Sequence, residues 1–140
     1  MDKYFYFRTV ADEDDDDAIT ADSVMMPVSK LSGVVPSNTG AAGTSADEVT
    51  LYFEPVANES SITDNDFIVM DSVLLNVTVG QAKNVCKAIA EAANGGPHTD
   101  GIIVVADDAT TDYDGTTKAA VYLHSGITSC GAVTMAAMLT

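Results

Sequence analysis

The first candidate for chemistry in this sequence is a run of six acidic side chains from Asp12 to Asp17. Carboxylates at alternate positions open the calcium-binding loop of an EF-hand. That loop needs glycine at its sixth position and glutamate at its twelfth, where this chain has Asp17 and Ser23. The run is therefore predicted to be a solvated loop between two strands, covering residues 11–22. A loose surface site for Ca²⁺ or Mg²⁺ is the alternative.

A second acidic group lies where a predicted strand ends and the next turn begins. Its members are Asp107, Asp108, Asp112 and Asp114. Ca²⁺ and Mg²⁺ take carboxylate and loop carbonyl oxygens as ligands, so side chains that converge at this turn could hold either ion. Asp64 and Asp66 form a smaller pair of the same kind. The alternative for both groups is that they are solvated turn residues, and no other cofactor is predicted.

Residues suited to zinc binding or nucleophilic catalysis are few in this chain. The cysteines and histidines are Cys86, His98, His124 and Cys130. No two of them have the close spacing of a zinc site. His124 and Cys130 are the one nominal pair of base and nucleophile, and the sequence around them lacks the G-x-S-x-G turn of a serine hydrolase. The chain is therefore predicted not to be an enzyme, and both cysteines are expected to be reduced thiols.

The elements that must position these side chains are mainly strands, predicted from short runs of β-branched and aromatic residues. The expected strands cover residues 3–10, 23–28, 48–56, 67–79 (in one or two pieces), 100–108, 119–125 and 127–135. Pro27 lacks the backbone N–H that an inner strand needs, which places its strand at a sheet edge or a bulge. Residues 31–35 are expected to form an apolar turn. Residues 36–47, rich in Gly, Ser, Thr and Ala, are expected to form a flexible loop.

One helix is predicted, over about residues 79–94. Its apolar stripe consists of Ala82, Val85, Cys86, Ile89, Ala92 and Ala93. A Gly-Gly-Pro sequence after Asn94 ends it, and Thr78 and Gln81 have the spacing of a capping box. One helix among about six to seven strands predicts a single α+β domain over residues 1–140. That domain is expected to be mostly antiparallel, with a sandwich or barrel-like architecture.

The charge balance excludes two classes of partner. The chain has 21 acidic and 6 basic residues, a formal net charge of −15. Nucleic acids and anionic membranes are bound by clustered lysine and arginine, so neither is a predicted partner. No apolar run approaches the ~18 residues of a membrane span. The N-terminus alternates in character where a signal peptide would have a continuous apolar segment, so no signal peptide is predicted.

Four segments carry a resemblance to a known group of proteins. They read KYFYFRT (3–9), DSVMMPVSKLSGVVPSNTG (22–40), LYFEPV (51–56) and VTVGQAKNVCKAIAEAANGGPHTDGIIVVADD (77–108). The aromatic first strand, the S-V-x-x-P strand, the helix and the D-G-x-x-V-x-A-D-D strand are similar to those of small virion-associated proteins of tailed phages that infect marine cyanobacteria. The resemblance implies a capsid decoration (cement) protein or another minor head component. It brings no catalytic residues with it.

Resemblance and composition together predict a non-enzymatic viral structural protein at the capsid surface of the virion, made in the host cytoplasm. Its expected partners are the major capsid protein and further copies of itself, in a homo-oligomer. A strongly acidic domain is expected to attach through apolar or aromatic surfaces. The residues predicted to make this contact are Tyr4, Phe5, Tyr6 and Phe7, unless their strand only completes the chain's own sheet. The alternative function is a calcium-dependent receptor- or glycan-binding module of a phage tail or fibre.

Overall fold

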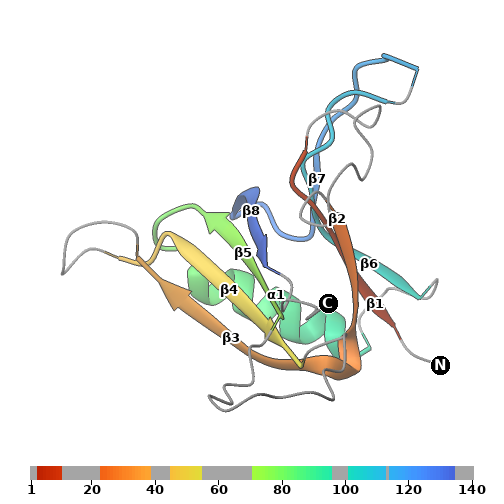
Figure 1. The fold of residues 1–140 in the computed structure, drawn as a ribbon. Helices are drawn as coiled ribbons and strands as arrows, with labels where there is room; N and C mark the ends of the chain where they lie inside the picture. The colour runs from red at the N-terminus through yellow and green to blue at the C-terminus, as the bar shows by residue number, and fades with distance from the viewer. Residues whose placement is uncertain are drawn as a thin grey trace, which may run out of the picture.

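The computed structural model describes residues 3–10, 23–38, 45–54, 71–95, 101–112 and 114–134. These residues form two four-stranded sheets, one α-helix and one short 3-10 helix (Figure 1). The fold is α+β, mostly antiparallel and sandwich-like, which confirms the predicted fold class. The acidic run at 12–17, the pair Asp64 and Asp66, and His98 lie outside the described residues.

The first sheet has the strand order β2-β1-β6-β7. Its strands are β1 (Tyr4–Arg8), β2 (Ser23–Pro27), β6 (Ile102–Asp107) and β7 (Val121–Tyr122). β1 is antiparallel to β2 and parallel to β6, and β7 is antiparallel to β6. β2 is an edge strand, as Pro27 predicted, because a residue without a backbone N–H does least damage where no further strand pairs.

The second sheet has the order β3-β4-β5-β8 and is antiparallel throughout. Its strands are β3 (Leu31–Ser37), β4 (Glu48–Phe53), β5 (Asp71–Val77) and β8 (Ile127–Thr134). The 3-10 helix η2 (Val28–Lys30) carries the chain from β2 into β3, and the helix α1 (Ala82–Ala93) packs against β3 and β4 (Figure 1). In the described part of the chain, no helix has the length and apolar character to span a membrane.

The core joins the two sheets and α1 in one cluster of buried side chains. Alternation along β4 buries Leu51 and Phe53 and leaves Tyr52 exposed. From the first sheet, Phe5 and Phe7 meet Phe53 edge to face, with ring centroids 6.2 to 6.3 Å apart. Each such ring buries about 150–250 Å², so this aromatic trio is a large part of the hydrophobic link between the sheets.

The prediction of an apolar turn at residues 31–35 is wrong, because these residues belong to β3 and pair with β4. Gly33 and Pro36 hide the strand in the sequence, since both residue types are depleted in sheets. β3 is an edge strand, where neither residue interrupts an inner ladder. The end of β3 also overlaps the predicted loop at 36–47, of which residues 39–44 lie outside the described structure.

The helix α1 confirms the predicted helix but not its predicted cap. Gln81 occupies the N-cap position, and its side chain makes no capping hydrogen bond. Its backbone N–H donates to the Thr78 carbonyl at 2.9 Å, and its Oε1 accepts from the Asn84 amide at 3.1 Å. The turn runs through Gly80 at φ +89°, a left-handed conformation that favours glycine. The prediction of a capping box is therefore wrong, because this turn places Gln81, and not Thr78, at the N-cap position of the helix.

Candidate functional site

The acidic residues that follow β6 belong to a hairpin arm, defined here as residues 108–112 and 114–120, which extends away from the second sheet (Figure 1). Thr111 and Thr117 form an antiparallel bridge across the arm. At its turn, the Gly115 N–H donates to the Asp112 carbonyl at 2.8 Å. Gly115 has φ +85°, which its lack of a Cβ permits. The arm therefore turns at residues 112–115, with Gly115 at the position that requires a positive φ.

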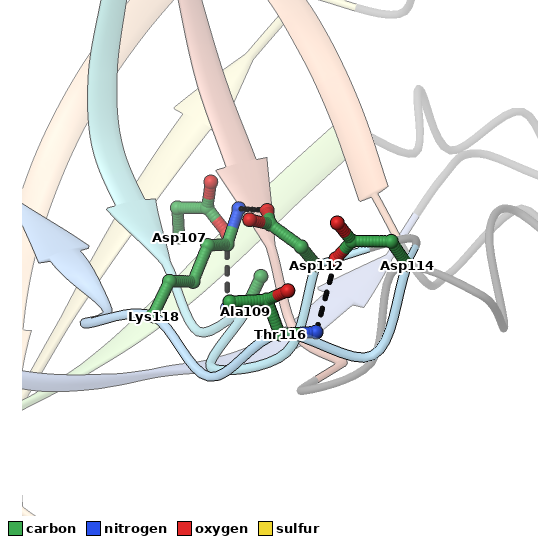
Figure 2. Close-up of polar contacts among 6 residues, drawn as sticks. All are labelled: Asp107, Ala109, Asp112, Asp114, Thr116 and Lys118. Carbon is green, nitrogen blue, oxygen red and sulfur yellow. Dashed lines mark hydrogen bonds and ion pairs between the residues drawn. The ribbon is translucent and has the colours of Figure 1, made fainter.

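Three of the four aspartates predicted as a cation site each face a donor of their own (Figure 2). The contacts are Asp107 Oδ1 with the Ala109 N–H at 3.0 Å, Asp112 Oδ1 with Lys118 Nζ at 3.4 Å, and Asp114 Oδ1 with the Thr116 N–H at 3.0 Å. Hydrogen bonds from the Thr116 hydroxyl and N–H hold the pKa of the Asp114 carboxyl below its ordinary value. The fourth, Asp108, uses its carboxylate elsewhere, on β7 and β8.

The structure therefore does not bring the four predicted ligands to one point. Among the residues it describes, no three His, Cys, Asp or Glu side chains gather into a group that could hold a metal ion. A cation bound at the arm would have to replace Lys118 as the partner of Asp112 and the Thr116 N–H as the partner of Asp114. The cation site stays a prediction, and it requires rearrangement of these contacts.

Millimolar calcium is expected to leave the melting midpoint of this protein unchanged from its value in a chelator. The reason is that the four carboxylates predicted as ligands already accept hydrogen bonds or an ion pair within the chain. An ion present at 100 times its dissociation constant would add about 2.7 kcal/mol to the free energy of unfolding. Differential scanning calorimetry with calcium, with magnesium and with EDTA measures this. A rise of several degrees with either ion, lost in Asp112→Asn, would establish the site.

Asp108 lies where the two sheets meet. Its Oδ1 accepts the Tyr122 hydroxyl of β7 at 2.7 Å, and its two carboxylate oxygens accept the Cys130 N–H of β8 at 3.0 and 3.1 Å. Its own N–H donates to the Arg8 carbonyl at the end of β1, at 3.1 Å. One half-buried residue thus connects three strands from both sheets, β7 and β8 through its carboxylate and β1 through its backbone N–H. We call Asp108, Tyr122 and Cys130 the Asp108 junction.

Tyr122 and Cys130 of the Asp108 junction are held in their neutral forms. Burial, and secondly the Asp108 carboxylate, raise the pKa of the Cys130 thiol to about 12. Burial and the hydrogen bond to Asp108 raise the pKa of Tyr122 above its ordinary value. A protonated thiol is a poor nucleophile. The His124 Nδ1 accepts the Gly126 N–H at 2.9 Å, so this nitrogen is occupied locally. The pairing of His124 with Cys130 as base and nucleophile gains no support from this geometry.

Stability is expected to fall between pH 9 and pH 10 through Cys130. Its pKa rises from an ordinary value of 9.0 to about 12 in the folded protein. The folded chain therefore keeps a proton that the unfolded chain releases, and the stability present below pH 9 is lost as pH rises. One such thiol lowers the free energy of unfolding by about 1.4 kcal/mol at pH 10. Urea unfolding at pH 7 to 10 measures it.

The matched variants for this pH dependence are Cys130→Ala and Cys86→Ala. Cys86 is only half-buried, and burial raises its pKa as well. Cys130→Ala should flatten the decline between pH 9 and pH 10, whereas Cys86→Ala should keep most of it. Equal slopes for wild type and Cys130→Ala would show that this thiol is not shielded in the folded state.

The residues of β1 predicted to contact a partner are divided between the two faces of the first sheet. Phe5 and Phe7 are fully buried in the core, so they cannot touch a partner in this structure. Tyr4 is exposed and Tyr6 is half-buried on the opposite face. The correction follows from strand alternation, which turns successive side chains to opposite faces. The contact prediction is thereby restricted to Tyr4 and Tyr6, where it remains a prediction.

Tyr4 and Tyr6 belong to a larger apolar surface, which we call the aromatic face. In the strand register, residues directly opposite each other share a face of the sheet. The aromatic face consists of Tyr4, Tyr6, Met25, Pro27, Ile102 and Val104. The sequence prediction missed Met25 and Ile102 because it could not show that β2 and β6 flank β1. Met25 and Ile102 directly precede Met26 and Ile103, which are buried. Strand alternation places the neighbours of buried residues on the opposite face of the sheet.

No protein-family model, curated protein or solved structure matches this chain, so its function is inferred from its own geometry.

Proposed function

We propose that this chain is a non-enzymatic structural protein of a phage virion, which decorates the surface of the head shell as a homo-oligomer. The observation that carries the proposal is the aromatic face, where Tyr4, Met25 and Ile102 are adjacent across three strands and exposed. Single exposed apolar residues are common on proteins. A cluster of them on a chain of net charge −15 is instead typical of a contact surface.

The use of the polar groups supports a structural role. The Asp108 carboxylate is engaged by β7 and β8, and the thiol of Cys130 is held protonated. These groups act in holding the sheets together. The acidic surface elsewhere discourages non-specific adhesion and keeps the protein soluble at the high density of a particle surface.

Quantitative mass spectrometry of purified virions tests this proposal. A decoration protein occupies many symmetry-equivalent positions on the shell, so we expect copy numbers on the order of hundreds, in a fixed ratio to the major capsid protein. A handful of copies would indicate a tail component instead. Absence of the chain from virions would refute a structural role in the particle.

Binding to head shells that lack this chain provides a second test. Purified protein should co-sediment with such shells up to a saturating stoichiometry. A different acidic protein of similar size serves as the control for non-specific trapping and should stay in the supernatant. Failure to saturate, or equal recovery of the control protein, would contradict specific attachment.

A further inference from the structure

The dipeptide Asn94-Gly95 lies at the C-terminal end of α1, where both residues are exposed. Asn94 is the only asparagine of this chain that precedes glycine. Glycine has no side chain to shield its backbone nitrogen, so this nitrogen can reach the side-chain amide of a preceding asparagine. Asparagine is a chemically labile residue, and a following glycine leaves its deamidation least hindered.

Two hydrogen bonds hold Asn94 at the end of the helix. Its backbone N–H donates to the Ala90 carbonyl at 3.1 Å, and its side-chain Nδ2 donates to the same oxygen at 2.9 Å. The side chain thus caps a carbonyl of the last turn, which a helix end leaves without a regular partner. Attack by the Gly95 nitrogen requires the amide carbon to turn towards the following residue. The amide can therefore react only after Nδ2 has released the Ala90 carbonyl.

The end of α1 is the part of the helix that opens with the smallest loss of contacts. Ala90, Glu91 and Asn94 are exposed, and Ala92 is the last fully buried residue of the helix. The bond from Nδ2 of Asn94 to the Ala90 carbonyl is itself exposed to solvent. Helix ends fray, and local opening of this kind needs far less free energy than global unfolding. The reactive arrangement is therefore accessible in the folded protein.

Asp114-Gly115, in the turn of the arm, shows how the same kind of dipeptide is protected. The Gly115 N–H donates to the Asp112 carbonyl at 2.8 Å, so its nitrogen is already engaged. Hydrogen bonds from Thr116 lower the pKa of the Asp114 carboxyl and favour the ionised form, which a nucleophile attacks poorly. At the end of α1 the reacting group is a neutral amide. Within the residues that the structure describes, none accepts a hydrogen bond from the Gly95 N–H.

We propose that Asn94 is a site of spontaneous deamidation, which reacts when the last turn of α1 opens. The Gly95 nitrogen attacks Cγ of Asn94 and loses its proton, the bond from Cγ to Nδ2 breaks, and ammonia leaves with that proton. Water then opens the cyclic imide at Cγ or at the backbone carbonyl carbon, which yields aspartate or isoaspartate. One water enters and one ammonia leaves, so no oxidant or reductant takes part. The inference does not depend on the proposed function.

The reaction is expected to weaken the end of α1. A carboxylate on residue 94 cannot donate to the Ala90 carbonyl, and it adds one negative charge to a chain of formal net charge −15. Negative charge is unfavourable at the C-terminal end of a helix, because the helix dipole is negative there as well. Isoaspartate also lengthens the backbone by one methylene group before Gly95. Deamidation thus loosens the turn that carries Ala92 into the core.

Asn94→Asp reproduces the aspartate product and is expected to lower the midpoint of urea unfolding. Asn84→Asp is the matched control, because it makes the same chemical change at an exposed position in the first turn of the same helix. A negative charge is favourable at that end, so this variant should keep the wild-type midpoint or exceed it. Equal midpoints for the two variants would contradict the expected weakening of α1.

Peptide mapping by mass spectrometry, on purified wild-type chain kept at mildly alkaline pH, tests the site itself. Asn76 and Asn84 both precede valine, whose branched side chain hinders the attack, and they serve as internal controls. Conversion of Asn94 to aspartate and isoaspartate is expected to be at least about tenfold faster than conversion of either control. Conversion of Asn94 at the rate of Asn84 would overturn the inference.

Two further comparisons test the role of the last turn. In urea the bond to the Ala90 carbonyl is absent, so Asn94 should convert several-fold faster than in the folded chain. Ala90→Gly weakens the helix near its C-terminal end and should speed conversion in the folded chain, whereas Lys83→Gly weakens the first turn and should leave it close to wild type. Equal rates in the folded and the unfolded chain would show that α1 does not control the reaction.

Discussion

Replacing Phe53 with alanine is expected to lower the free energy of unfolding by about 3–5 kcal/mol. Phe53 is fully buried, and its ring packs edge to face against Phe5 and Phe7 of the other sheet. Removing the ring leaves a cavity whose walls belong to two separate sheets, so the site cannot close by a small local movement. Native proteins are stable by only about 5–15 kcal/mol, so this loss is a large fraction of the total. Urea unfolding followed by circular dichroism measures it.

The neighbouring residue Tyr52 supplies the control for this substitution. It lies on the same strand but points to the exposed face of the second sheet. Tyr52→Ala is expected to change the free energy of unfolding by at most about 1 kcal/mol. If Phe53→Ala does not fold, Phe53→Leu should still cost about 1–2 kcal/mol. A Phe53 variant with the wild-type urea midpoint would show that the aromatic trio does not hold the sheets together.

Replacing Asp108 with alanine is expected to lower the free energy of unfolding by about 2–4 kcal/mol. The substitution leaves two partners without an acceptor, the Tyr122 hydroxyl and the Cys130 N–H. Unpaired polar groups in a desolvated environment are costly, and these two lie on different sheets. Asp114→Ala is the matched control, because Asp114 is exposed and bonds only within its own turn, so this variant should keep a urea midpoint close to that of wild type.

A double-mutant cycle separates the Tyr122 hydrogen bond from the other effects of removing Asp108. Asp108→Ala, Tyr122→Phe and the pair should give a coupling energy of about 1–2 kcal/mol, because the two side chains bond directly at 2.7 Å. If Asp108→Ala costs no more than Asp114→Ala, the carboxylate does not act as a link between the sheets.

Local patterns in the sequence were sufficient for much of the secondary structure. The apolar stripe of α1 repeats at helical spacing, and Ala82, Val85, Ile89 and Ala92 are indeed the buried residues of the helix. Short runs of β-branched and aromatic residues also identified β1, β4 and β6 within a few residues of their ends. These signals are local because a helix or strand face is defined by neighbours in the chain.

Strand pairing and the β3 strand could not be predicted in the same way. β1 pairs in parallel with β6, a contact that depends on packing between distant segments and leaves no short-range pattern. Gly33 and Pro36 obscured β3, because their effect on a strand depends on whether it is at an edge. The sequence therefore divided the side chains of β1 between two faces. It did not indicate which of these faces the rest of the protein covers.

The predicted cation site shows that a group of acidic residues in the sequence does not by itself identify a metal site. Asp107, Asp112 and Asp114 are close in sequence, but each carboxylate has its own donor within the same part of the chain. The three carboxylates therefore do not converge on one point. Asp108 differs only because strand β6 ends beside β8 and the arm returns as β7. Its role could be recognised only once Tyr122 and Cys130 were placed next to it.

The parallel pairing of β1 with β6 also determines when this protein can fold during its synthesis. Tyr4 pairs with Ile102, so β1 leaves the ribosome long before its partner strand has been translated. Contacts between such distant segments form late, because the intervening chain must first be brought together. The second sheet likewise waits for β8, near residue 134. The aromatic face is thus completed only after most of the chain has been made.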